Sequence, residues 1–266
     1  VGLPFIVSGY NTKAAWGLTN QGADMVDLFI EQVDWENETY LYRGKQRKLT
    51  VREETFQVKD NEPVKKKIYY AGRRPIMNDV FTDMDADVSL DWTGFDSVAV
   101  TGFVHINRAR WYRDILKGAR DVKMSPQNMV FADSRGNIGY RVLGSLPLRK
   151  EGTGNFPADG TRVSATWNGF IPDNNYPMFL NPSRGYIITA NNRVMPDYRY
   201  YLNATFAPGY RYENIAVMLR ENSGVDVDYV KKMQTDTHTV LAKKVIPIMM
   251  KYVQAEGERG SKALQL

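Results

Sequence analysis

The chain lacks cysteine entirely and has only two histidines among its 266 residues. Without cysteine it can form neither a disulfide bond nor a thiolate metal site, and it is compatible with the cytoplasm or with an exported compartment. The histidines, His105 and His238, are far apart in the sequence. The sequence therefore gives little support to a Ser-His-Asp triad or to a histidine-rich metal centre.

Long apolar segments are also missing. No apolar run approaches the ~20 residues that a membrane-spanning helix needs, and no signal peptide is visible at the Val1 end. The sequence has no internal repeat and no low-complexity segment. Because 43% of the residues are hydrophobic and 12% are aromatic, the chain can bury a substantial core. We expect residues 1–266 to form a single domain without a membrane span.

The charge balance is basic, with a net charge of +5 and an isoelectric point near 9.2. Such a balance can indicate a nucleic-acid partner. The basic residues are dispersed, however, and their densest clusters, residues 43–48 and 65–67, lie on expected hairpin edges. Lysine at such an edge commonly blocks pairing with another strand. We therefore expect no nucleic-acid partner.

Alternating apolar residues and turn signals predict strands in the first part of the chain and helices mainly near its end. The expected strands cover residues 2–8, 14–19, 25–33, 41–43, 48–59, 64–71, 85–92, 128–133, 138–143 and 185–190. The expected helices cover residues 107–121, 210–220, 227–234 with Asp226 as N-cap, and 238–253, which Pro247 should kink or break. Residues 148–182 predict an irregular loop with a short strand at 163–167, and residues 254–266 predict a frayed tail.

The stretch from Gly9 to Asp27 combines turn residues, a lone tryptophan and two carboxylates. Asn20-Gln21-Gly22 breaks an apolar run and allows a backbone with positive φ, so amides there can point outward. Asp24 and Asp27 flank the Val26 carbonyl, a pattern that suits a hard cation if the backbone bends. On these residues alone, a hairpin with a solvated acidic end is the favoured interpretation.

Several motifs together are more specific than any one of them. They are Trp16-Gly17-Leu18-Thr19 followed by Asp24-Met25-Val26-Asp27, then Ala132 to Tyr140, Asn181 to Ile187, Ala190-Asn191-Asn192, and Ala207-Pro208-Gly209-Tyr210-Arg211. In this order the chain resembles the penicillin acylase (penicillin amidase) family of N-terminal-nucleophile hydrolases over roughly residues 2–254. One departure is Arg73-Arg74-Pro75-Ile76, where family members usually have His-Gly-Pro-Ile.

The resemblance implies an α+β fold, part of a four-layer αββα sandwich with a β-meander excursion and C-terminal helices. The strand-then-helix order is consistent with it. The resemblance also implies that residues 1–266 are an internal fragment of a penicillin acylase β-chain. The nucleophile would lie upstream of Val1, and the α-chain and the remainder of the β-chain would be the partners of this fragment.

The activity implied is hydrolysis of a linear amide of the penicillin or acyl-homoserine-lactone type, with a small-molecule substrate. An N-terminal serine would attack the carbonyl, while its own α-amine, with a reference pKa of about 7.7–8.0, takes the proton. We expect the fragment alone to be inactive. The alternative is a non-catalytic binding or assembly chain with the same fold. The residues do not decide the compartment, and the resemblance implies a periplasmic or extracellular one.

The resemblance also assigns site residues. It gives the backbone N–H of Asn20 and the side-chain amide of Asn191 to the oxyanion, places Arg211 beside the amine of the nucleophile, and makes Leu18 the one substrate-pocket position that can be carried over. From the residues alone, Asn20 and Asn191 are turn asparagines and Arg211 is a surface residue. A cation at a helix start is unfavourable, which mildly supports a specific role for Arg211.

The same resemblance makes Asp24, the carbonyl of Val26 and Asp27 ligands of a structural Ca²⁺. Calcium takes six to eight oxygens, so the remaining ligands would come from the missing partner chain and from downstream loops. We therefore expect a fragment to bind the ion poorly.

Overall fold

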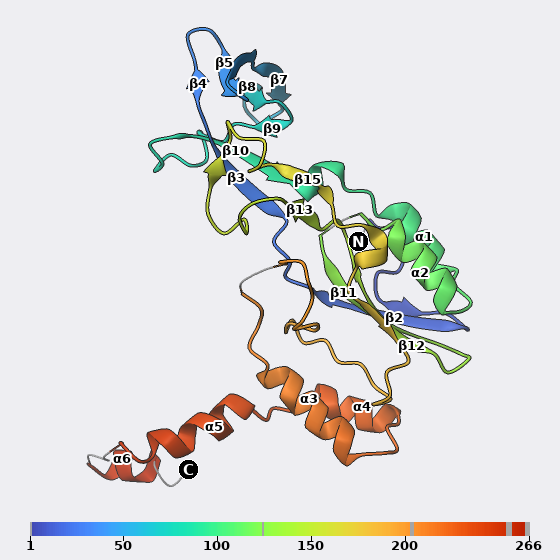
Figure 1. The fold of residues 1–266 in the computed structure, drawn as a ribbon. Helices are drawn as coiled ribbons and strands as arrows, with labels where there is room; N and C mark the ends of the chain where they lie inside the picture. The colour runs from blue at the N-terminus through green and yellow to red at the C-terminus, as the bar shows by residue number, and fades with distance from the viewer. Residues whose placement is uncertain (1, 124, 203–204, 254–256, 264–266) are drawn as a thin grey trace.

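The computed structural model describes residues 2–123, 125–202, 205–253 and 257–263. A mixed α/β body is built around one antiparallel sheet, with strand hairpins at one end and helices at the other (Figure 1). The sheet has the order β1-β2-β11-β12-β16. Its strands are β1 Gly9–Tyr10, β2 Ala14–Asn20, β11 Gln127–Asp133, β12 Ile138–Leu143 and β16 Met178–Leu180.

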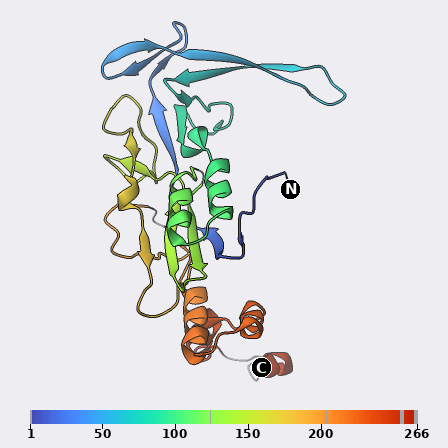
Figure 2. The same ribbon diagram turned by 90° about the vertical axis from the view of Figure 1, so that its right-hand side faces the viewer.

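Helices cover one face of this sheet, and irregular chain covers the other. Helices α1 (Val100–Asn107) and α2 (Tyr112–Arg120) cover one face (Figures 1 and 2). Their apolar side chains pack there against Trp16 and Phe131, which are buried. On the other face, the buried cluster around Tyr140 and Val142 packs against the irregular chain that follows β16, up to Leu202. Apolar burial on both faces is the main stabilising term for such a layered arrangement.

A second, smaller sheet continues from the first through the chain after Asn20. It has the order β10-β3-β14, with β3 at Val26–Glu31, β10 at Asp87–Trp92 and β14 at Ala158–Asp159. Phe29 and Val88 are completely buried in it. Beside it, β13 (Pro147–Arg149) pairs with β15 (Trp167–Phe170).

Two hairpin units lie beyond this sheet. The first consists of β4 Val33–Asp34, β5 Thr39–Tyr42 and β6 Lys45–Lys48, and the second of β7 Thr50–Phe56, β8 Val64–Ala71 and β9 Arg74–Pro75. The β7–β8 ribbon projects from the body, as predicted for the β-meander (Figure 2). Most of its side chains are exposed, and lysines 65, 66 and 67 line one of its strands. Charged residues of this kind discourage pairing with another chain.

The opposite end of the molecule is helical, with α3 Tyr210–Glu221, α4 Val227–Gln234, α5 Val240–Met249 and α6 Gly257–Ala263. The predicted cap of α4 is confirmed, because the side chain of Asp226 accepts a hydrogen bond from Tyr229 N at 2.8 Å. Pro247 lies inside α5, which ends two residues later. Among the described residues, no helix is long and apolar enough to cross a membrane.

Four local predictions were wrong, and asparagine side chains explain two of the errors. Residues 2–8 form no strand, because Ile6 exchanges its backbone hydrogen bonds with the side chain of Asn107, at 2.7 and 2.8 Å. The predicted helix over 107–121 is interrupted, because the Asn11 side chain donates to the carbonyls of Asn107 and Ala109, at 2.9 and 3.0 Å. Such side-chain bonds compete with regular secondary structure. Helix α1, which precedes the interruption, was not predicted.

The other two errors concern residues 163–167 and 185–190. The short strand lies at Trp167–Phe170, and residues 185–190 form no strand, with bends at Gly185 and Ala190. In the tail, α6 occupies part of the stretch predicted to be frayed, and residues 254–256 and 264–266 lie outside the described residues. The mixed α/β fold agrees with the prediction, whereas the full four-layer αββα arrangement stays a prediction.

Candidate active site

Three residues that were predicted to be catalytic meet in one hydrogen-bonded chain. The side-chain amide of Asn191 donates to the carbonyl oxygen of Asn20 at 2.8 Å. The guanidinium of Arg211 donates to Oδ1 of Asn191 at 2.9 Å. Asn20 ends strand β2, Arg211 lies in the first turn of α3, and Asn191 lies in the irregular chain between β16 and α3. We call Asn20, Asn191 and Arg211 the amide–arginine trio.

The neighbouring strand holds Asn20 in place. Gln127 and Asn128 of β11 donate side-chain hydrogen bonds to the Asn20 side chain and carbonyl, at 3.1 and 3.2 Å. Asn128 is itself buried and accepts a hydrogen bond from the Tyr140 hydroxyl at 2.8 Å. Burial raises the pKa of Tyr140 far above its ordinary value, so this hydroxyl stays protonated and can donate. The Asn20 carbonyl thus accepts from both Asn128 and Asn191.

A turn presents Asn191, which corrects the prediction that it ends a rigid strand. Its φ is 59°, in the left-handed region that asparagine tolerates better than most residues. Its carbonyl accepts from Ala207 N at 3.0 Å, and the Asn192 side chain accepts from Ala190 N at 3.0 Å. Asn192 therefore closes the turn, and Asn191 is left to reach Asn20.

The two neighbours of Asn191 fix the orientation of its amide. A guanidinium can only donate, so the atom that faces Arg211 must be the amide oxygen. The amide nitrogen then faces the Asn20 carbonyl, which can only accept. One of the two N–H bonds is used there, and the second can serve another acceptor. Arg211 also withdraws charge from the amide oxygen, which strengthens the N–H groups as donors.

Leu18, the predicted pocket residue, lies two residues before Asn20 in β2 and therefore on the same face of the sheet. Its side chain is half-buried and packs against the apolar cluster that contains Phe103 and Met129. No hydrogen bond joins Leu18 to the trio among the described residues; its backbone N–H donates to Ser8 at 3.2 Å. Its contact with a substrate stays a prediction.

The predicted calcium ligands Asp24 and Asp27 lie together, and an arginine lies between them. Arg149 approaches Asp27 with Nε and a terminal nitrogen, each 2.8 Å from a carboxylate oxygen. The same terminal nitrogen lies 3.3 Å from Asp24 Oδ2 and 3.2 Å from the Asp24 carbonyl. The indole N–H of Trp167 also donates to Asp27. Burial raises the pKa of Asp24, and the Val26 N–H and Arg149 only partly offset that effect.

This arrangement does not match the set of oxygen ligands that calcium takes. The Arg149 guanidinium lies between the two carboxylates and offsets one of their two negative charges, and the backbone of Gly154 lies close to both. A Cβ at Gly154 would lie 2.3 Å from Asp24 Oδ2 and 2.4 Å from Asp27 Oδ1. The described residues contain no group of three or more acidic, histidine or cysteine side chains that could hold a metal. Calcium at Asp24, Val26 and Asp27 would require Arg149 to move, and it stays a prediction.

Comparison with known proteins identifies the family. The family model described as penicillin amidase matches residues 1–266, the whole chain. The chain belongs to the penicillin amidase family. Because the match extends from end to end, the amide–arginine trio and the acidic pair Asp24 and Asp27 both lie within it.

Individual relatives of this penicillin amidase chain come from several bacteria. It is 29% identical over 259 residues to an acyl-homoserine lactone acylase, QuiP, of Pseudomonas aeruginosa, a match that covers 92% of the chain and 30% of that protein. It is 31% identical over 202 residues to penicillin G acylase of Escherichia coli, which covers 73% of the chain and 23% of that protein. The chain thus spans about 30% of the length of the first of these relatives.

A solved structure shows the same fold. The thermostable penicillin G acylase of Alcaligenes faecalis superposes with a TM-score of 0.81 at 22% identity, over 98% of this chain and 48% of that one. At this identity the likeness supports the fold alone. It shows that the mixed α/β architecture is that of penicillin G acylase.

Sequence reasoning missed two residues that organise this penicillin amidase chain. Asn128 is a polar residue at the start of a predicted strand, and only the structure shows that it is buried. Arg149 lies 122 residues from Asp27, and no local pattern links the two. The basic pair that departs from the family motif also has partners, since Arg73 pairs with Asp91 at 2.6 Å and Arg74 with Glu31 at 2.7 Å.

Proposed function

We propose that the full-length protein containing this chain hydrolyses a linear amide of the penicillin or acyl-homoserine-lactone type. An N-terminal serine outside residues 1–266 would form an acyl-enzyme, and water would release the acid. Family membership and the names of the relatives support the class of reaction. We also propose that residues 1–266 alone are inactive and that the full-length protein acts in the periplasm or outside the cell.

The observation that carries the proposal is the meeting of Asn20, Asn191 and Arg211. Asn20 and Asn191 are 171 residues apart in sequence, yet their polar atoms are at hydrogen-bonding distance. This contact brings the donor amide of Asn191 to the backbone of Asn20, and a pair of neutral donors suits the oxyanion of a tetrahedral intermediate. In this proposal the Asn20 N–H and the second N–H of Asn191 donate to that oxyanion.

The remaining steps follow from charge and proton balance. The serine hydroxyl attacks the amide carbonyl, and its proton passes to the α-amine of the same residue and then to the departing amine. Arg211, fixed against Asn191, adds a positive charge that disfavours protonation of the nearby α-amine. An amine held neutral near pH 7 can act as the base.

The test compares two neighbouring asparagines in the full-length protein. Because Asn191 has a positive φ, glycine is the replacement that avoids backbone strain. We expect Asn191→Gly to lower kcat by about 10²-fold or more with little change in KM, since the interaction forms mainly in the transition state. Steady-state kinetics on an amide substrate measures both constants.

Asn192→Ala is the matched control, because Asn192 bonds only to the turn backbone among the described residues. We expect it to change kcat much less. Equal losses in the two variants, or a change in KM alone, would show that the pair is merely a turn. A full-length protein with no amidase activity at all would favour the non-catalytic binding or assembly chain.

A further inference from the structure

A cavity of about 380 Å³ lies between the hairpins and the smaller sheet, apart from the amide–arginine trio. Its lining comes from β5 and β6, the β8–β9 turn, β10 and β15. None of Asn20, Asn191 and Arg211 contributes to it. The volume is within the range of small-molecule sites, about 300–1,000 Å³.

Three arginines line the cavity, and two of them are already engaged. Arg73 lies 2.6 Å from Asp91 and 2.9 Å from Asp96. Arg74 is buried and lies 2.7 Å from Glu31. Its Nε is a buried donor without a partner among the described residues. These two guanidiniums are held in place by three carboxylates, those of Asp91, Asp96 and Glu31, which offset their positive charge.

Arg47 differs from the other two. Its guanidinium has no hydrogen bond and no ion pair within the part of the chain that the structure describes; it lies 5.0 Å from the centroid of the Tyr42 ring. Strand β6 places Arg47 directly opposite Tyr40 of β5. An arginine fork that is stacked on a ring, with its donors unused, is preorganised to bind a carboxylate by two parallel hydrogen bonds.

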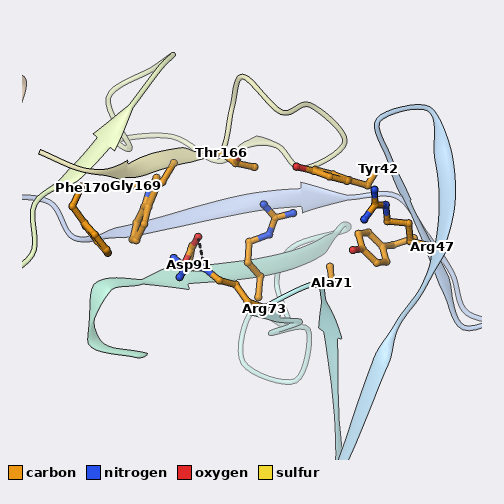
Figure 3. A pocket seen from close by; sticks show the side chains of 12 residues that line it. Tyr42, Arg47, Ala71, Arg73, Asp91, Thr166, Gly169 and Phe170 are labelled. Atoms are coloured by element: carbon orange, nitrogen blue, oxygen red, sulfur yellow. Dashed lines mark hydrogen bonds and ion pairs between the residues drawn. The ribbon is translucent and has the colours of Figure 1, made fainter. Parts of the chain in front are cut away.

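The cavity is elongated, and aromatic rings lie at both ends. Figure 3 shows Tyr42 and Arg47 at one end, Phe170 and Gly169 at the other, and Arg73 with Asp91 between them. Trp167 stands beside Phe170, with ring centroids 6.3 Å apart, and Arg73 lies 5.6 Å from the centroid of the Trp167 ring. The end away from Arg47 therefore presents flat apolar surface.

We propose that this cavity is a binding site for a small molecule that carries a carboxylate on a flat aromatic ring system. The carboxylate accepts hydrogen bonds from the free guanidinium of Arg47, and the rings extend toward Trp167 and Phe170. Arg73, fixed by Asp91, lies between the two ends of the cavity and over the ring of Trp167. This site is separate from the proposed amidase site and does not depend on it.

Isothermal titration calorimetry on the full-length protein tests the proposal with naphthalene-2-carboxylate as the probe. We expect saturable one-site binding of the carboxylate and at least about tenfold weaker binding of naphthalene-2-carboxamide, which has the same shape without the charge. Arg47→Gln should weaken binding of the carboxylate by about tenfold or more. Phe170→Ala should weaken it while leaving the preference for carboxylate over carboxamide in place.

Lys65→Gln is the matched control, because it removes the same charge from the exposed β7–β8 ribbon outside the cavity. It should leave the affinity unchanged, and so should Arg211→Gln at the amidase site. Three results would overturn the proposal. These are no binding to the full-length protein, equal binding of carboxylate and carboxamide, and a loss in Lys65→Gln or Arg211→Gln that equals the loss in Arg47→Gln.

Discussion

The amide–arginine trio and the acidic pair lie only four residues apart along the chain, at Asn20 and Asp24, and each contacts an arginine. In the trio, Arg211 is exposed and bonds to a neutral amide whose second N–H can serve another acceptor. In the acidic pair, the Arg149 side chain is 7% exposed and satisfies two carboxylates. An arginine near water can polarise a donor for chemistry, whereas a buried one is committed to holding the structure together.

The largest expected effect is on stability, at Arg149. Replacing Arg149 by methionine removes the counter-ion of Asp24 and Asp27. The Asp27 side chain is only 6% exposed, so water cannot take the place of the guanidinium. Breaking a buried ion pair in this way typically costs about 3–5 kcal/mol. Urea unfolding of Arg149→Met measures the loss. Arg162→Met is the control, because Arg162 pairs with Glu151 at an exposed site and should lose less than about 1 kcal/mol. Similar losses in the two variants would show that the buried ion pairs of Arg149 stabilise the fold no more than an exposed pair does.

Calcium sharpens the same comparison. An ion present at about 100 times its Kd adds about 2.7 kcal/mol to the folded state. If calcium binds at Asp24, Val26 and Asp27 of the full-length protein, its melting temperature should rise with calcium, and the rise should vanish in the variant that carries both Asp24→Ala and Asp27→Ala. Thermal denaturation with calcium and with a chelator measures this.

Equal calcium dependence in the parent and the double variant would rule the site out. If neither depends on calcium and Arg149→Gln acquires the dependence, Arg149 takes the place of the ion in this chain. Arg149→Gln removes the guanidinium and leaves both carboxylates and the Val26 carbonyl in the protein.

The effect at Arg211 should be smaller on stability and visible in turnover. Arg211→Gln removes an exposed charge, so its cost in unfolding free energy should be below about 1 kcal/mol. Because the Asn191 amide loses its fixed orientation, we expect kcat to fall by about tenfold. Arg184→Gln is the control, since Arg184 bonds to Tyr186 and Tyr212 away from Asn191. A large loss of stability in Arg211→Gln would make Arg211 a structural residue like Arg149.

The smallest effect concerns pH. Burial raises the pKa of Asp24 in the folded state, so that state binds the proton more tightly than the unfolded chain does. The contribution of Asp24 to the free energy of unfolding therefore falls as pH rises from its ordinary pKa of about 3.9 through the folded value. Asp24→Asn should remove this slope, as measured by urea unfolding at pH values from about 3 to 6. An unchanged slope would show that Asp24 is not its source. Asn20 and Asn191 have no titratable side chain, so they contribute no pH dependence of this kind.

Local patterns in the sequence determined the elements whose signals are near neighbours along the chain. Strand β8 has the predicted bounds, and helix α4 follows the Asp226 cap as predicted. The strands β11 and β12 were predicted from alternating residues around a Gly and Asn turn, and both form. In each case at least part of the backbone hydrogen bonding lies within the element or with a strand next to it along the chain.

The sequence order of several motifs, compared with a family, indicated which residues belong together at the candidate site. Asn20, Asn191 and Arg211 were named in that way, since none of them is distinctive by itself. Their catalytic roles stay predictions, whereas their meeting is a feature of the structure.

Only the tertiary structure decided which distant side chains bond to backbone groups and which pair with buried charges. Asn107 takes the hydrogen bonds that a strand over 2–8 would have used, and the turn at Asn191 replaces the predicted strand end. Arg149 meets Asp27 across 122 residues of sequence. A buried carboxylate needs a counter-charge close by. The fold brings Arg149 to Asp27 because β13 pairs with β15 beside β3. No local pattern of residues specifies that pairing.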